Sequence, residues 1–160
     1  MPLIPRARLD LLYSLAAEGD CEWAARLMAA SDPWVRFGRT VPECAAFLAP
    51  GAHSQLLIAW ERTTRIGYLL AWPFEFAETA YLASIAIDPA HRGRGAGRAM
   101  VAHFEQRYSP PARHAFLSVS AFNDRARGLY ERIGYGVIAR IPKFLRGRGD
   151  DLIMHKRLAY

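Results

Sequence analysis

The chain has 160 residues, of which 52% are hydrophobic and 22% charged, and its formal net charge is +6 at neutral pH. This length suits one domain with a real core, and no apolar run approaches the length of a membrane span. The positive charge comes from 19 Arg and only 2 Lys, most of them scattered, so the sequence does not favour the basic, aromatic-interleaved surface of a nucleic-acid-binding protein.

The N-terminal third of the chain predicts helices. Residues 1–19 are ambiguous, although their leucine spacing suggests a helix. Residues 21–30 predict a helix with one apolar face, for which Asp20 is a candidate N-cap. Residues 40–48 begin with the Thr-x-x-Glu spacing of a capping box and predict a second helix. Between the two helices, residues 31–39 form a loop that is rich in aromatic side chains.

The rest of the chain predicts six strands and two helices. In chain order these elements are the strands 56–60, 66–72 and 81–87, a helix that ends at Pro110, the strand 115–120, a helix over 123–133, and the strands 137–141 and 152–155. This order is not the regular alternation of strand and helix that gives a parallel sheet. The sequence therefore predicts an α+β domain with a mixed sheet.

A glycine-rich turn follows the strand 81–87 and reads Arg-Gly-Arg-Gly-Ala-Gly-Arg from Arg92 to Arg98. Glycine lets the backbone approach an anion closely, and the first turn of a helix offers free N–H groups and the positive end of its dipole. The guanidinium groups of Arg92, Arg94 and Arg98 add forked donors that suit phosphate oxygens. Strand, glycine-rich turn and helix in this order predict a phosphate-binding site.

The spacing of the glycines separates this turn from two better-known phosphate loops. The G-x-x-x-x-G-K-[ST] string of a Walker loop does not occur. Gly93 and Gly95 match the first two positions of the dinucleotide fingerprint G-x-G-x-x-G, but Arg98 stands in the place of its third glycine. What remains is Arg-x-x-Gly-x-Gly, formed by Arg92, Gly95 and Gly97.

A second motif lies between Asn123 and Tyr135. By its residues it is a short amphipathic helix, which Asn123 or Asp124 can cap and Gly134 ends. It also matches the pattern N-x-x-A-x-x-L-Y-x-x-x-G-[FY]. The matching residues are Asn123, Ala126, Leu129, Tyr130, Gly134 and Tyr135. With both motifs in this order, the chain resembles the GCN5-related N-acetyltransferases, the GNAT superfamily, most clearly over 81–135 and recognisably over 55–160.

The resemblance implies one GNAT-like domain over 1–160, a three-layer αβα arrangement of helices around a mixed, largely antiparallel sheet. In this family an edge strand often lies near the start, and the region 1–50 would lie on the side of the acceptor. The cofactor implied is acetyl-CoA, with its pyrophosphate on the glycine-rich turn and its pantetheine arm along the backbone of 84–87. The residues implied to bind it are Ile85, Ala86, Ile87, Arg92, Gly93, Arg94, Gly95, Ala96, Gly97, Arg98, Asn123 and Tyr130.

The resemblance also suggests catalytic residues. Tyr130 would be the general acid that protonates the departing thiolate, or it would only pack on the sheet; Asn123 would contact the pantetheine or only cap its helix. The motifs are nearest to the ribosomal-protein and protein N-terminal acetyltransferases, whose base is a glutamate five residues before the asparagine. That position is Ser118 here. Glu75 and Glu78 are the candidate bases, and Asp150, Asp151 and His155 are weaker candidates.

These observations predict an N-acetyltransferase that moves an acetyl group from acetyl-CoA to a primary amine of a small molecule or peptide by direct attack in a ternary complex, releasing CoA. Because Ser118 replaces the glutamate, a non-catalytic acyl-CoA-binding sensor or regulatory domain is the alternative. The histidines show no metal-ligand spacing, and Cys21 and Cys44 imply no disulfide framework. A cytoplasmic location without membrane association is expected, and the oligomeric state stays open, a homodimer included.

Overall fold

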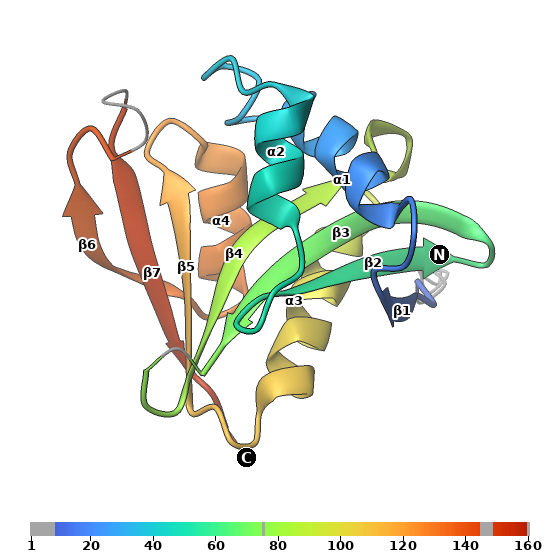
Figure 1. Cartoon of the computed structure of the whole chain (residues 1–160). Coiled ribbons are helices and arrows are strands. Elements are labelled where there is room, and N and C mark those ends of the chain that lie inside the picture. The colour runs from blue at the N-terminus through green and yellow to red at the C-terminus, as the bar shows by residue number, and fades with distance from the viewer. Residues whose placement is uncertain (1–8, 75, 145–148, 160) are drawn as a thin grey trace, which may run out of the picture.

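The computed structural model describes residues 9–74, 76–144 and 149–159. Its elements in chain order are β1 (Leu12–Leu15), α1 (Asp20–Ala29), α2 (Val41–Leu48), β2 (Gln55–Glu61), β3 (Thr64–Pro73), β4 (Thr79–Ile87), the 3₁₀ turn η1 (Pro89–His91), α3 (Ala96–Tyr108), β5 (His114–Ser120), α4 (Asp124–Arg132), β6 (Gly136–Ile141) and β7 (Asp151–Arg157). A central sheet lies between α1 and α2 on one face and α3 and α4 on the other (Figure 1).

The strands form one sheet in the order β1-β2-β3-β4-β5-β7-β6. Every neighbouring pair is antiparallel except β4 and β5, which run parallel. The α+β class, the mixed and largely antiparallel sheet and the three layers that the sequence predicted are therefore confirmed.

Two hydrophobic clusters hold the three layers together, one on each face of the sheet. Under α3 and α4, the apolar side chains of Met100, Phe104 and Tyr130 pack against alternate residues of the strands. Under α1 and α2, Met28 and Leu48 pack against the opposite face of β2, β3 and β4. Because each strand of the central part is covered on both sides, these strands are rich in consecutive apolar residues.

The N-terminal helices begin in different ways. Thr40 caps α2 as predicted: its Oγ1 accepts from the Glu43 N–H at 3.3 Å, and the Glu43 carboxylate accepts from the Thr40 N–H at 2.9 Å. The prediction that Asp20 caps α1 is wrong. Gly19 is the N-cap, with φ +82°, and Asp20 is the first helical residue. Its buried carboxylate accepts from the Ala17 N–H and pairs with Arg65 at 2.7 Å.

The leucines near the start do not form the helix that their spacing suggested. Leu12–Leu15 is the edge strand β1, paired antiparallel with β2. Leu12 and Leu15 remain 63% and 56% exposed, while Tyr13 stacks on His103 of α3 with ring centroids 3.7 Å apart. Pairing with β2 thus outweighs a weak helical pattern, in agreement with the edge strand that the family resemblance allowed.

The one parallel pair of strands, β4 and β5, diverges after a short contact. The two strands pair from Thr79 to Leu82 on β4 and from His114 to Leu117 on β5. On the other side of β4, Leu82 and Ser84 face consecutive residues of β3, so Ala83 is an extra residue that bends the strand. Beyond this bulge the described structure gives the last part of β4 no strand partner toward β5.

Candidate active site

Two connected cavities occupy the gap between β4 and β5. The larger has a volume of about 470 Å³ and is lined by Ser31, Asp32, Ile85, Ala86, Ile87, Arg92, Gly93, Gly95, Ala96, Gly97, Arg98, Asn123, Arg125, Ala126, Leu129, Tyr130 and Arg132. The smaller has about 100 Å³ and is lined by Asp32, Pro33, Trp34, Leu82, Ala83, Ser84, Ile85, Leu117, Ser118, Val119, Ser120, Asn123, Ala126, Tyr130 and Asp151. We call them the arginine cavity and the acceptor cavity. Asp32, Ile85, Asn123, Ala126 and Tyr130 line both.

The glycine-rich turn forms one wall of the arginine cavity. Gly93 and Gly95 have φ of +75° and +87°, and an added Cβ at either position would meet no atom within 4 Å. Gly95 is the N-cap of α3, so the free N–H groups of the first helical turn lie beside this open space. Gly97 has a different role, because its missing Cβ lets α3 approach Leu129 of α4. The backbone of the turn is therefore open to an anion.

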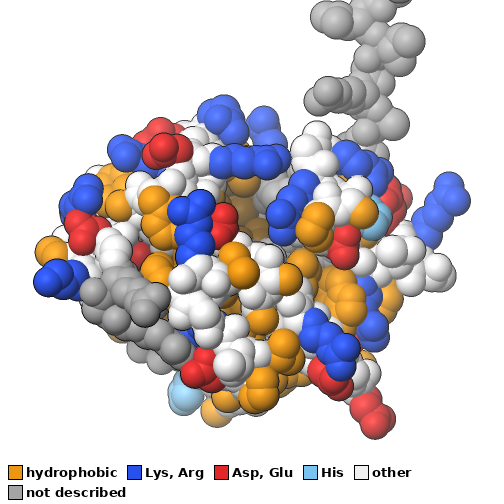
Figure 2. Space-filling view, turned by 90° about the horizontal axis from the view of Figure 1, so that it is seen from above, with side chains coloured by type: hydrophobic (Ala, Val, Ile, Leu, Met, Phe, Trp, Pro, Cys, Tyr) orange, Lys and Arg blue, Asp and Glu red, His pale blue; other side chains and the backbone are white. Residues whose placement is uncertain are grey.

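Arginine side chains surround the same cavity. Arg92 and Arg98 come from the glycine-rich turn, as predicted from the sequence, whereas Arg125 and Arg132 come from α4. Figure 2, which looks down on the end of the sheet where α3 and α4 begin, shows Lys and Arg side chains gathered around a hollow. The sequence reasoning missed Arg125 and Arg132, although residues seven apart lie on one face of a helix and could have been recognised.

The Arg92 side chain is held in place by two hydrogen bonds. Its Nε donates to the Ile87 carbonyl at 2.9 Å, and an Nη donates to the Ser31 hydroxyl at 3.3 Å. Arg94 does not join it. Both Nη atoms of Arg94 contact the Glu61 carboxylate, at 2.9 and 2.6 Å, and Arg94 does not line either cavity. This geometry does not favour the expected contact of Arg94 with the cofactor, because Glu61 already neutralises its guanidinium group.

The last part of β4 forms the floor between the two cavities. Ile85, Ala86 and Ile87 line the arginine cavity, and Ala83, Ser84 and Ile85 line the acceptor cavity. Because β5 has diverged here, this edge of β4 presents backbone N–H and C=O groups to a ligand instead of a strand. The three residues that the resemblance assigned to the pantetheine arm therefore lie against the larger cavity.

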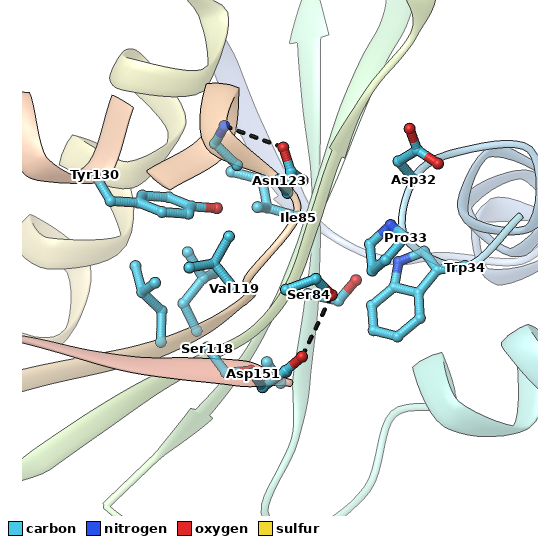
Figure 3. A pocket seen from close by; sticks show the side chains of 15 residues that line it. Asp32, Pro33, Trp34, Ser84, Ile85, Ser118, Val119, Asn123, Tyr130 and Asp151 are labelled. Carbon is cyan, nitrogen blue, oxygen red and sulfur yellow. Dashed lines mark hydrogen bonds between the residues drawn. The ribbon is translucent and has the colours of Figure 1, made fainter. Parts of the chain in front are cut away.

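Asn123 and Tyr130 bring α4 to the junction of the cavities. The Asn123 side chain accepts from the Ala126 N–H at 3.2 Å, which caps the helix. The Tyr130 side chain is buried, and its hydroxyl points into the space beside Ile85 (Figure 3). Among the described residues, no hydrogen bond to that hydroxyl is seen. Burial raises the pKa of Tyr130 to about 12, so the phenol keeps its proton at neutral pH.

The structure does not bring Glu78, one of the two candidate bases, to this junction. Glu78 precedes β4 at the end opposite to Ile87, lines neither cavity, and pairs with Arg113 at 2.8 Å in an exposed position. This geometry does not support the expectation that Glu78 deprotonates an amine beside Tyr130. Glu75 lies outside the described residues. Ser118 lines the acceptor cavity, and its hydroxyl is 3.0 Å from that of Tyr81.

The acceptor cavity has an acidic and aromatic character. Asp151 and Asp32 supply carboxylates, and Trp34 supplies a ring. Trp34 begins a row of half-buried rings that continues through Phe47, Trp72 and Tyr81, with successive centroids 6.2, 5.9 and 5.4 Å apart. A carboxylate at the end of an aromatic row suits a cation with an apolar body. Of the three weaker sequence candidates, only Asp151 reaches the cavity.

A contact between two loops closes one side of the junction. The Arg36 guanidinium lies 4.4 Å from the ring centroid of Phe122, and its Nε contacts the Asp32 carboxylate at 3.0 Å. Phe37 meets the same Phe122 ring edge-on, with centroids 6.2 Å apart. These contacts join the loop between α1 and α2 to the turn between β5 and α4.

The geometry suggests neither a metal centre nor a membrane segment within the described ranges. Residues 9–74, 76–144 and 149–159 contain no group of three or more His, Cys, Asp and Glu arranged to hold a metal ion. No helix in those same ranges is both long enough and apolar enough to cross a membrane.

A mixed αβα sheet that opens between two parallel strands, with a glycine-rich turn at the opening, defines an acyltransferase-type fold. The model of the acetyltransferase (GNAT) family matches residues 21–135, and the chain belongs to this family.

Three relatives show how far the similarity extends. An uncharacterized protein of Mycobacterium leprae is 28% identical over 152 residues, which are 95% of this chain but 38% of that protein. The chain thus spans well under half of this relative. The N-alpha-acetyltransferase RimI of Mycobacterium tuberculosis is 26% identical over 143 residues, 88% of this chain and 85% of RimI. The ribosomal-protein-S18-alanine N-acetyltransferase of Escherichia coli has a similar fold, with a TM-score of 0.77, 20% identity and coverage of 94% and 96%.

Proposed function

We propose that the protein is an acetyl-CoA-dependent N-acetyltransferase that acetylates a primary amine of a small molecule or peptide by direct attack within a ternary complex. One observation carries this proposal. The protonated hydroxyl of Tyr130 lies where a basic cavity, suited to a phosphorylated donor, meets an acidic cavity, suited to an amine.

The arginine cavity fits CoA. The open backbone at Gly93 and Gly95, with the first turn of α3, would hold the pyrophosphate. Arg92, Arg98 and Arg125 would neutralise phosphate charge from different sides. The unpaired edge of β4 would bind the amide groups of the pantetheine arm through its backbone. When bound, acetyl-CoA supplies the thioester that is the source of the acetyl group.

Tyr130 is suited to be the general acid. As the amide forms, the C–S bond of the thioester breaks, and a proton given to the sulfur as it departs makes CoA a better leaving group. A phenol whose pKa is raised to about 12 by burial holds its proton throughout the neutral range. No hydrogen bond to a described residue competes for this hydroxyl, so it is available to donate to the sulfur at the junction. Asn123, which caps α4, fixes the start of the helix that carries Tyr130.

The test is release of free thiol from acetyl-CoA in the presence of a panel of amines: 2-phenylethylamine, tryptamine, spermidine and a peptide that begins with alanine. We expect at least one amine to raise thiol release far above the reaction without amine. Acetyl-CoA binding is measured separately by calorimetry. A protein that binds acetyl-CoA but acetylates none of these amines would favour an acyl-CoA-binding regulatory domain, and a protein that does not bind acetyl-CoA would contradict the cofactor assignment.

A further inference from the structure

Asp151 stands at the start of β7 and faces the acceptor cavity. Its side chain is only 4% exposed. The register of β5 and β7 places it opposite Ser120, whose hydroxyl donates to the Asp151 carboxylate at 3.3 Å. Figure 3 shows the Asp151 carboxylate and the Tyr130 hydroxyl turned toward the same space, from a strand and a helix that approach it from different sides.

Among the described residues Asp151 has no basic partner, in contrast to several other acidic side chains around the sheet. Those carboxylates pair with arginine: Asp20 with Arg65, Glu61 with Arg94, Glu78 with Arg113, and Asp150 with Arg140. Within residues 9–74, 76–144 and 149–159, no Lys or Arg contacts Asp151. A buried carboxylate without a cation is unfavourable. Because this one opens onto a cavity, a cationic ligand would remove the penalty.

The position of Asp151 also explains why a serine, Ser118, can stand where the resemblance led us to expect a glutamate. Ser118 pairs with Ile153, two residues beyond Asp151 on β7 and on the same face of the sheet. Side chains related in this diagonal way lie roughly 7–8 Å apart. A carboxylate from Asp151 therefore enters the space that a glutamate at position 118 would use, and the small Ser118 side chain leaves that space open.

We propose that Asp151 is the catalytic base: its carboxylate binds the ammonium group of the acceptor and takes a proton from it. This inference rests on the proposed acetyltransferase function. The nitrogen, now neutral, attacks the thioester carbonyl carbon, the C–N bond forms, and the C–S bond breaks. Tyr130 gives its proton to the sulfur and regains one from the nitrogen as the amide forms. The proton on Asp151 passes to solvent, so the charges and protons balance.

The surroundings of Asp151 suit this task. Burial raises its pKa, and hydrogen bonding from the Ser120 and Ser118 hydroxyls opposes that rise. The other titratable groups that line the cavity are the Tyr130 hydroxyl and the Asp32 carboxylate, which is paired with Arg36. The Tyr81 hydroxyl does not line it but contacts the hydroxyl of Ser118, which does. A raised pKa makes the carboxylate a stronger base when it is ionised.

The experiment compares Asp151→Asn with Asp150→Asn. Asp150 undergoes the same change one residue earlier, but its side chain pairs with Arg140 and lines neither cavity. With the best amine of the panel, Asp151→Asn should lower kcat by about 10²- to 10⁴-fold, whereas Asp150→Asn should keep it. Acetyl-CoA affinity and the melting temperature should change little in Asp151→Asn. Its pH profile should also lose the acid limb, in which the wild-type rate rises as Asp151 loses its proton.

Two further measurements separate a base from a structural residue. The first uses a weakly basic amine, which is already neutral at the assay pH. The rate of its acetylation should fall much less in Asp151→Asn than the rate with a strongly basic amine. The second uses the double variant Ser118→Glu with Asp151→Asn, which returns a carboxylate to the same space from β5. Its kcat should be at least about tenfold higher than that of Asp151→Asn alone.

Wild-type kcat in Asp151→Asn at every pH would overturn the proposal. So would an equal loss for both amines together with a fall in melting temperature. Neither result would contradict the proposed function, which fails only if the wild-type protein acetylates no amine of the panel.

Discussion

The arginine cavity and the acceptor cavity meet at Tyr130 but are built in different ways. The positively charged groups of the first come from two continuous segments, the glycine-rich turn with the start of α3, and α4, and its other binding groups include backbone amides of the turn and of β4. The second is assembled from β4, β5, β7, α4 and the loop between α1 and α2, and its Asp151 carboxylate is buried. In the proposed function, a donor that is always the same would be bound by a short motif, whereas the acceptor would be selected by side chains far apart in the sequence.

The largest effect should come from the junction itself. Tyr130→Phe keeps the ring but removes the proton donor, so kcat should fall by about 10²- to 10⁴-fold while acetyl-CoA affinity and the melting temperature stay near wild type. Steady-state kinetics with one good amine gives the result. Tyr135→Phe is the matched control, because this buried ring packs edge-on against Tyr130 at 6.2 Å but lines neither cavity. Full activity in Tyr130→Phe would remove the assignment of the acid.

A somewhat smaller effect, on acetyl-CoA affinity, should follow from a change in the backbone of the glycine-rich turn. Gly95→Val forces a β-branched residue into φ +87° and places its side chain in the open space of the arginine cavity, so acetyl-CoA affinity should fall by about 10²-fold, measured by calorimetry. Gly19→Val is a matched control: it also changes a helix N-cap, with φ +82°, but far from the cavity. If both variants bind acetyl-CoA equally well, the turn does not hold the phosphate.

Two neighbouring arginines of the glycine-rich turn should differ in their effect on acetyl-CoA affinity. Arg92→Ala should weaken acetyl-CoA binding by about 10- to 100-fold, the range expected for one charge-assisted contact. Arg94→Ala should leave the affinity nearly unchanged, because Arg94 pairs with Glu61 outside the cavity. Calorimetry on the two variants checks this, and an equal loss in both would show that general positive charge, rather than the geometry of the turn, attracts the ligand.

The smallest effect should be confined to the acceptor side. Trp34→Ala removes the ring at the cavity end of the aromatic row, so the KM for an aromatic amine should rise by about 2- to 30-fold, the worth of a cation–π or ring contact. The affinity for acetyl-CoA should not change. Should the affinity for acetyl-CoA fall instead, the two cavities would not be separate binding sites.

Much of the fold could be predicted because its signals are local. The capping box at Thr40, the glycine-rich turn and the amphipathic α4 each lie within a few residues, and the structure forms all three. The strand β1 could not be predicted from its leucines, because its conformation is fixed by pairing with β2, more than forty residues later in the chain.

The same distinction, between local signals and contacts of distant residues, explains which parts of the candidate site could be predicted. The positions of Arg92, Gly95 and Tyr130 follow from motifs, but the different direction of Arg94 depends on Glu61, which lies on another strand. The place of Glu78 in the sequence, just before β4, suggests a role at the site, yet the length of β4 separates it from the junction. Asp151 could be ranked only once the register of β5 and β7 was known.

The short pairing of β4 with β5 has a consequence for the protein in solution. These strands pair over Thr79–Leu82 only, whereas β5 pairs with β7 along its whole length. The two halves of the sheet are therefore joined by a short contact, and the amides of Ser84–Ile87 that point away from β3 have no strand partner among the described residues. A bound pantetheine arm would act as the missing length of strand. Hydrogen–deuterium exchange at these amides should accordingly slow when acetyl-CoA is added, before any acceptor is present.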